Sequence, residues 1–268
     1  MISDQEFAAF QRLIHQLAGI HLSDAKKQLV FGRLRSRVRQ LGLDSFEAYF
    51  KLVSSGTQAE ERQMVIDLLT TNETYFFREP RHFEVLRNEL LPVRSRSRPF
   101  RVWSAASSSG EEAYSIAMVL ADVCGMARHP GWEVFGSDIS RRVIEKARLG
   151  RYPMQRIDGI PRNLLQQYCL KGTGTQDGTL QIDGPLRERV RFEQVNLNDR
   201  LPDIGKFDLV FLRNMLIYFQ TPTKTEIVRR VVDTLIPGGW LFVGHSESLK
   251  GLDDRLQPHS PSIYRTAA

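Results

Sequence analysis

Hydrophobic positions in the first ninety residues recur at helical spacing and show no strand-like alternation. Apolar residues lie three or four positions apart over 7–17 and again over 31–41, where the pattern ends at Gly42, a residue type that commonly ends helices. A third helix is predicted over 58–69. These patterns predict an all-helical amino-terminal domain over residues 1–75.

The stretch that follows has the composition of a linker. Arg94, Arg96 and Arg98 alternate with serines directly before Pro99. Polar residues that end in a proline are typical of exposed connections. We therefore predict a linker over residues 76–99.

From residue 100 onward, apolar runs of strand length alternate with helical patterns. Alternation of this kind is typical of a mostly parallel sheet with helices on both faces. The predicted fold class is therefore α/β, a doubly wound Rossmann-like domain over residues 100–268. Its strands are predicted at 100–106, 132–137, 190–197, 207–212 and 240–244, with an edge strand at 262–265.

Glycines interrupt this alternation over residues 170–193. Gly172, Gly174 and Gly178 separate short segments in which apolar and polar residues alternate. The pattern predicts a small antiparallel β insertion. The free edge of such an insertion can accept an extended peptide as an added strand, but a hairpin without a partner fits the sequence equally well.

The first strand of the α/β domain runs into a turn of small residues. Residues 100–120 read FRVWSAASSSGEEAYSIAMVL, a buried strand followed by three serines, Gly110 and a helix with one apolar face. Such a turn lets a ligand approach the backbone, although it also serves as an ordinary helix cap. Asp138 closes the second strand, where an acid can accept both hydroxyls of a ribose or cap the next helix.

Composition indicates the cellular compartment of the protein. No apolar run among the 268 residues approaches the roughly 20 needed to span a membrane, and residues 1–10 lack the features of a signal peptide. Cys124 and Cys169 have no metal-type spacing, which favours a reducing cytoplasm without disulfides or zinc. We expect a cytoplasmic protein that binds no metal and does not insert into membranes.

Charge indicates an acidic partner. The net charge of +6 is compatible with a nucleic acid, a membrane surface or an acidic protein. Six basic residues and no acidic one lie between Lys26 and Arg39, on the second predicted helix. A helix face with one sign of charge favours a docking surface for a negative partner, with added solubility as the alternative.

Five separated segments carry a resemblance to a known family. They read TTNETYFFRE, RVWSAASSSGEEAYSIA, FGSDIS, FDLVFLRNMLIYF and PGGWLFVGHSE, in order over about residues 18–265. Together they resemble the CheR family, the S-adenosylmethionine-dependent methyltransferases that esterify glutamates on bacterial chemoreceptors. The resemblance implies a protein-glutamate O-methyltransferase of chemotaxis whose product is S-adenosylhomocysteine. It also implies a helical domain, a linker and a methyltransferase domain with a three-stranded β-subdomain.

The resemblance also assigns roles to ten residues. Arg78 and Tyr218 resemble the pair that lines the methyl-transfer centre, where Arg78 either orients the substrate or clamps the cofactor carboxylate. The His-Ser-Glu turn at 245–247 belongs to a family motif, but we expect it to be structural. The positions that resemble cofactor-binding residues are Asn72, Thr74, Arg78, Glu112, Asp138, Asn196, Leu197, Arg213 and Asn214.

Partners follow from the same resemblance. The basic helix Lys26–Arg39, with Arg33 and Arg37, is expected to contact the glutamate-bearing methylation helices of chemoreceptors. The glycine-rich insertion resembles a subdomain that docks a receptor carboxyl-terminal pentapeptide in some relatives. A nucleic-acid substrate is not expected, because no Asp/Asn-Pro-Pro-aromatic signature follows the fourth strand. Two alternatives remain open: a family member that acts on another signalling receptor, and an inactive cofactor-binding module.

Overall fold

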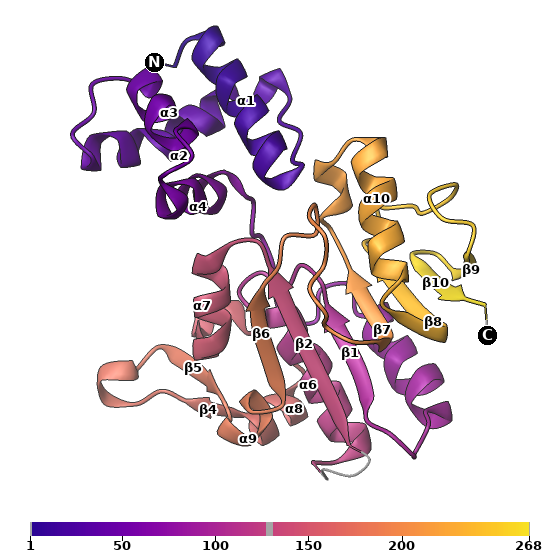
Figure 1. Cartoon of the computed structure of the whole chain (residues 1–268). Coiled ribbons are helices and arrows are strands. Elements are labelled where there is room, and N and C mark those ends of the chain that lie inside the picture. The colour runs from indigo at the N-terminus through magenta and orange to yellow at the C-terminus, as the bar shows by residue number, and fades with distance from the viewer. Residues whose placement is uncertain (1, 127–130, 268) are drawn as a thin grey trace.

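The computed structural model describes residues 2–126 and 131–267, so the predicted domain ends at residues 1 and 268 lie outside the described residues. Four helices form the amino-terminal domain (Figure 1). The sequence analysis missed the third of them, because its apolar pattern covers only nine residues. The helices are α1 (Asp4–Ala18), α2 (Lys27–Gln40), α3 (Phe46–Ser54) and α4 (Ala59–Leu69), with the 3₁₀ turn η1 (Asp24–Lys26) before α2.

Local sequence explains where these helices begin and how they pack. Ser3 and Glu6 form a reciprocal capping box at the start of α1. Phe10 of α1 lies against Tyr49 and Phe50 of α3, with ring centroids 6.0 and 5.7 Å away, and Phe10 and Tyr49 have no exposed surface. The helical domain therefore has its own apolar core.

Much of the predicted linker is helical. The segments α5 (Arg81–Val85), η2 (Leu86–Leu90) and η3 (Leu91–Val93) carry a buried face of Phe83, Leu86 and Leu90. This face joins the core on one side of the main sheet, so only the arginine- and serine-rich residues 94–99 match an exposed connection. The prediction extended the linker composition of residues 94–99 back over residues 81–93, whose apolar residues form the helical face.

The main sheet confirms the predicted doubly wound α/β class. Its strand order is β6-β2-β1-β7-β8-β10-β9; the first five are parallel and β10 and β9 are antiparallel. The strands are β1 (Phe100–Ser104), β2 (Trp132–Asp138), β6 (Val190–Gln194), β7 (Phe207–Leu212), β8 (Leu235–Val243), β9 (Leu256–Ser260) and β10 (Ile263–Thr266). The chain order reverses beside β1, which is where ligands bind in open α/β sheets.

Helices cover both faces of this sheet (Figure 1). Apolar residues of α6 and α7 pack with the segment 81–93 on one face, and those of α10 pack on the other around Trp103 and Phe207. The bounds of these helices are α6 (Glu111–Cys124), α7 (Arg141–Leu149) and α10 (Thr221–Val232).

The small antiparallel sheet begins earlier than the predicted insertion 170–193. Its order is β3-β5-β4, and β6, which overlaps the end of the predicted insertion, belongs to the main sheet, as the strand predicted at 190–197 does. The first strand escaped prediction because three residues are too few to show alternation. The region contains β3 (Arg151–Pro153), η4 (Met154–Arg156), α8 (Arg162–Tyr168), β4 (Cys169–Lys171), η5 (Gly174–Gln176), β5 (Thr179–Ile182) and α9 (Gly184–Arg187).

The end of α1 docks on the carboxyl edge of the main sheet. The His21 backbone N–H donates to the Tyr218 carbonyl at 2.8 Å, and the Asn196 side chain donates to the Leu17 carbonyl at 2.9 Å. Gly19 ends α1 with a φ of 72°, and a Cβ atom there would lie 2.6 Å from Asn198 Oδ1. The backbone angle therefore favours glycine, and a Cβ atom would in addition force the Asn198 side chain to shift.

Gly19→Ala should lower the free energy of unfolding more than Gly42→Ala. Both glycines have a positive φ, which costs an alanine about 1–2 kcal/mol, but Gly42 has open space around its Cα. The contact with Asn198 should add about 1–3 kcal/mol at Gly19. Urea unfolding of both variants measures the difference, and equal losses would show that the Asn198 side chain moves aside without cost.

Candidate active site

One cavity of about 420 Å³ lies between the helical domain and the carboxyl edge of the main sheet. Its volume lies in the usual range for cofactor sites. The connection from α1 to α2 lines one side of it, and the ends of β1, β2, β6 and β7 line another. All ten predicted site residues line this cavity: Asn72, Thr74, Arg78, Glu112, Asp138, Asn196, Leu197, Arg213, Asn214 and Tyr218.

The serine-rich turn after β1 forms part of the cavity wall. Ser108 has a φ of 48°, and its backbone N–H donates to Asp138 Oδ2 at 3.0 Å. Its hydroxyl donates to the Asn72 carbonyl at 2.9 Å, which ties the turn to the segment after α4. Gly110 has a φ of 97°, and a Cβ atom there would lie 3.0 Å from the Tyr152 hydroxyl, so this position favours glycine.

Asp138 connects the turns that follow the first two strands. Its Oδ1 accepts the Ser140 backbone N–H at 2.9 Å, which together with the bond from Ser108 fixes the turn before α7, but α7 begins after Ser140 and Asp138 does not cap it. The residue is only 8% exposed, and this burial raises the pKa of its carboxyl group to about 6. Each carboxylate oxygen has a further lone pair, so Asp138 can also accept hydroxyls from a ligand in the cavity.

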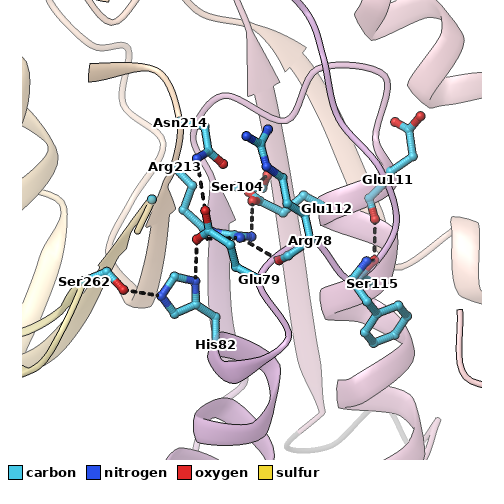
Figure 2. Close-up of polar contacts among 12 residues, drawn as sticks. Arg78, Glu79, His82, Ser104, Glu111, Glu112, Ser115, Arg213, Asn214 and Ser262 are labelled. Carbon is cyan, nitrogen blue, oxygen red and sulfur yellow. Dashed lines mark hydrogen bonds and ion pairs between the residues drawn. The ribbon is translucent and has the colours of Figure 1, made fainter. Parts of the chain in front are cut away.

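Arg213 lies beneath the cavity, and three groups hold its guanidinium (Figure 2). Nη1 donates to Glu112 Oε2 at 2.8 Å, and Nη2 donates to the Arg78 carbonyl at 2.6 Å and lies 3.0 Å from Glu79 Oε2. The side chain is 1% exposed. Although Arg213 lines the cavity, its charge is therefore directed to protein groups that form the wall.

The two glutamates around Arg213 differ in acidity. Burial raises the pKa of Glu112, although Arg213 and the Ser104 hydroxyl, which donates to Glu112 Oε1 at 2.7 Å, oppose that shift. Burial acts in the same direction on Glu79, but Arg213, Asn214 and the His245 backbone outweigh it and lower the pKa of Glu79 to about 2. Glu79 is therefore a fixed negative charge at neutral pH.

Glu247 holds the chain that carries Tyr218. Its carboxylate accepts backbone N–H groups of Asn214, Leu216 and Gly244 at 2.7–2.8 Å. These bonds orient the turn between β7 and η6 (Leu216–Tyr218). The contacts fit the structural role expected of the 245–247 turn.

Asn196 uses its side-chain amide within the protein. Its Nδ2 donates to the Leu17 carbonyl and to Asp199 Oδ2, both at 2.9 Å. The residue therefore joins the helical domain to the end of β6 at the cavity wall. The sequence pattern indicated its position beside the cavity but not these partners.

Glu79, His82 and His245 bring three potential metal ligands within 4.8 Å of one another. His82 and His245 lie far apart in the chain, so the sequence does not indicate that they meet. Burial lowers the pKa of His82 to about 3, so its ring is neutral. Arg213 lies 3.0 Å from the same Glu79 oxygen that faces the histidines and already supplies a positive charge, which disfavours a divalent cation there.

Residues that the sequence analysis did not name complete the site. Glu79 and Ser104 form part of its buried network, and Ser108 connects two segments of the wall. All three lie inside the segments used for the family resemblance, so motif membership was the available signal. The cavity residues of the helical domain, such as His21 and Leu22, carried no such signal.

The parallel strands of the main sheet have a cavity where their order reverses, and the buried Asp138 ends the second of them. These features define a Rossmann-like cofactor-binding protein. Residues 72–264 match the CheR methyltransferase SAM-binding domain, and residues 5–70 match the CheR methyltransferase all-alpha domain. The chain belongs to the CheR methyltransferase family, and its cofactor is S-adenosylmethionine.

Full-length relatives support the same assignment. The chemotaxis protein methyltransferase of Salmonella typhimurium is 43% identical over 265 residues, 98% of this chain and 90% of the relative. That of Escherichia coli is 44% identical over 98% of this chain and 91% of the relative. Chemotaxis protein methyltransferase 2 of Pseudomonas aeruginosa is 38% identical over 98% of this chain and 93% of the relative. Within the part of the chain that the structure describes, no helix is long and apolar enough to cross a bilayer.

S-Adenosylmethionine should bind more weakly at acidic pH. Ribose hydroxyls that donate to Asp138 favour its ionised form, whereas the pKa of about 6 means that the free protein holds a proton there in acid. The dissociation constant should be steady above pH 7 and rise about tenfold between pH 7 and 5. Calorimetric titration measures this profile.

Asp138→Asn should weaken binding at neutral pH and remove the pH dependence. The exposed Asp177→Asn serves as the control and should keep the profile of the unmodified protein. An unchanged affinity down to pH 5 in the unmodified protein would contradict the role of Asp138.

Proposed function

We propose that the protein transfers the methyl group of S-adenosylmethionine to glutamate side chains of bacterial chemoreceptors, and that it does so in the cytoplasm. The observation that carries the proposal is that Arg78 and Tyr218 line the same cavity as Asp138. Arg78 follows α4, and Tyr218 ends η6, so distant segments converge there. The names of the relatives support a substrate in chemotaxis.

The residues present fit the cofactor. Asp138 offers a buried carboxylate to the ribose, and the small-residue turn around Ser108 leaves room beside the backbone. Asn72 and Thr74 line the cavity from the segment after α4. When bound, S-adenosylmethionine supplies an electrophilic methyl group on a positively charged sulfur.

Methylation of a glutamate requires alignment and no general base. A glutamate with a pKa of about 4.3 is already ionised near neutral pH. Arg78 uses one N–H group on the Glu73 carbonyl at 3.1 Å, and its guanidinium lies 5.7 Å from the Tyr75 ring centroid. The other N–H groups of Arg78 can orient a substrate carboxylate, while Tyr218 bounds the same cavity. Alignment of this kind can lower a barrier by about 7–11 kcal/mol.

Arg78→Ala should abolish methyl transfer, because it removes the group that orients the carboxylate. Tyr218→Phe should lower it about 10- to 100-fold by removing one hydroxyl from the reaction centre. The measurement is transfer of radiolabelled methyl from S-adenosylmethionine to receptor-bearing membranes, with release of the label by base as the mark of an ester.

The control is Arg81→Ala, which removes an exposed arginine three residues from Arg78 and should keep full activity. Cofactor affinity is measured for every variant. Tight cofactor binding by the unmodified protein without label on any receptor would favour the inactive binding module. A base-stable label would contradict a glutamate ester.

The basic face of α2 is smaller than the sequence indicated. Arg33 donates to the Leu69 and Thr70 carbonyls at 2.9 Å, and Arg37 forms a two-bond ion pair with Glu61. These arginines are therefore structural. Arg35 and Arg39 are exposed beside a shallow hollow, and we propose that they contact the acidic methylation helices.

Arg35→Glu with Arg39→Glu should raise the KM for receptor about tenfold or more without changing cofactor affinity, because like charges then oppose docking. Arg96→Glu with Arg200→Glu changes the net charge equally at other exposed positions and serves as the control. Methylation kinetics at two salt concentrations measure the effect. An equal rise in the control would show that only net charge matters.

The small sheet supports a second receptor contact. Its order β3-β5-β4 leaves the outer edges of β3 and β4 without a partner strand within that sheet. Leu170 of β4 is 55% exposed. We propose that a receptor carboxyl-terminal peptide adds a strand at one of these edges, which would raise the local substrate concentration.

A further inference from the structure

The backbone on both sides of Arg78 has an unusual conformation. Phe77 has a φ of 54° and Glu79 a φ of 57°. Only five described residues other than glycine have a positive φ, and two of them flank Arg78. Such conformations are strained for residues with side chains, and they persist only where surrounding contacts hold them. The chain around Arg78 is therefore fixed by its neighbours.

Ser115 of α6 holds the Phe77 side of this turn. Its Oγ accepts the Phe77 backbone N–H at 3.0 Å. The same hydroxyl donates to the Glu111 carbonyl at 2.7 Å, as Figure 2 shows. Ser115 has no exposed surface. One buried hydroxyl therefore fixes the peptide that precedes Arg78 to the first turns of α6.

Glu79 holds the other side. Its Oε1 accepts Asn214 Nδ2 at 3.1 Å and the His245 backbone N–H at 3.2 Å, and its Oε2 lies 3.0 Å from Arg213 Nη2. These partners come from the ends of β7 and β8. Glu79 therefore attaches the Arg78 segment to two strands of the main sheet, as Figure 2 shows for Asn214 and Arg213.

Arg213 completes the attachment by binding the Arg78 carbonyl itself at 2.6 Å. The backbone around Arg78 is thus held by Ser115 at Phe77, by the contacts of the Glu79 side chain, and by Arg213 at the Arg78 carbonyl. The Arg78 guanidinium lies beside the cavity. A long arginine side chain has many rotamers, so fixing its backbone reduces the freedom that alignment must remove.

We propose that Glu79 is a positioning residue for methyl transfer, which sets the location of Arg78 by holding this strained turn on the ends of β7 and β8. The inference rests on the proposed role of Arg78 at the methyl-transfer centre. It assigns Glu79 no contact with the reacting atoms. Ser115 performs the matching task on the opposite side.

Glu79→Gln tests the inference with little risk to folding. Two glutamates share one arginine, so the variant leaves a balanced pair between Glu112 and Arg213. The amide oxygen of glutamine can still accept from Asn214, but the ion pair is lost. We expect kcat to fall about 10- to 100-fold because displacement by about 1 Å has effects of that size. The KM for S-adenosylmethionine should stay within about threefold. The melting temperature should fall only modestly, because the lost charge of Glu79 stabilises the fold but the Asn214 contact is kept.

Measuring Glu79→Gln in an Arg78 variant distinguishes a positioning role of Glu79 from a general structural role. If Glu79 acts through Arg78, Glu79→Gln should lower kcat by less than about threefold in an Arg78→Lys background. Ser115→Ala should behave in the same way, which gives a second test should Glu79→Gln fold poorly. Glu89→Gln, at a partly exposed glutamate paired with His259, is the control and should leave kcat unchanged.

The outcomes distinguish the two proposals. Full methyl transfer by Arg78→Ala would overturn the proposed reaction centre. Loss of transfer in Arg78→Ala combined with equal effects of Glu79→Gln in both backgrounds would overturn the positioning role alone. A fall in cofactor affinity that accounts for the whole loss of activity in Glu79→Gln would also overturn it.

Discussion

The site depends on the ion pairs of Arg213 with Glu79 and Glu112. This guanidinium, 1% exposed, joins the segment after α4 and the first turn of α6 to the end of β7. Loss of Arg213 would leave two largely buried carboxylates without their partner, which is costly. These three segments of the cavity wall therefore form one connected unit.

Features that oppose stability gather at this unit. Asp138 is buried with a raised pKa, and Phe77, Glu79, Ser108 and Asn214 all have positive φ values. Away from the cavity, the sheet follows ordinary rules, with Trp103 and Phe207 stacked in an apolar core. Local conflicts of this kind are expected where binding and alignment set the requirements. Burial of the apolar core offsets the free energy that these buried and strained groups cost.

The fold was predictable where the local pattern is long. Strands such as β7, with six buried residues, and helices such as α6 appear directly in the hydrophobic spacing. Some shorter elements were missed: α3 has nine residues, and β3 has three. A segment of that length carries too few positions to show a period, so tertiary packing decides its structure.

Sequence by itself determined which residues gather at the site, because strand ends and turns of a doubly wound sheet meet at one edge. All ten predicted residues line the cavity, although Asn72, Thr74 and Arg78 do so from the segment after α4, where the family resemblance and not the sheet pattern indicated them. Tertiary structure alone decided what each side chain binds. Arg213 bonds to Arg78, 135 positions away, and Arg37 pairs with Glu61, which removes it from the basic surface of α2. A charge count cannot reveal such partners, since a buried charge is satisfied by whichever distant group the fold places beside it.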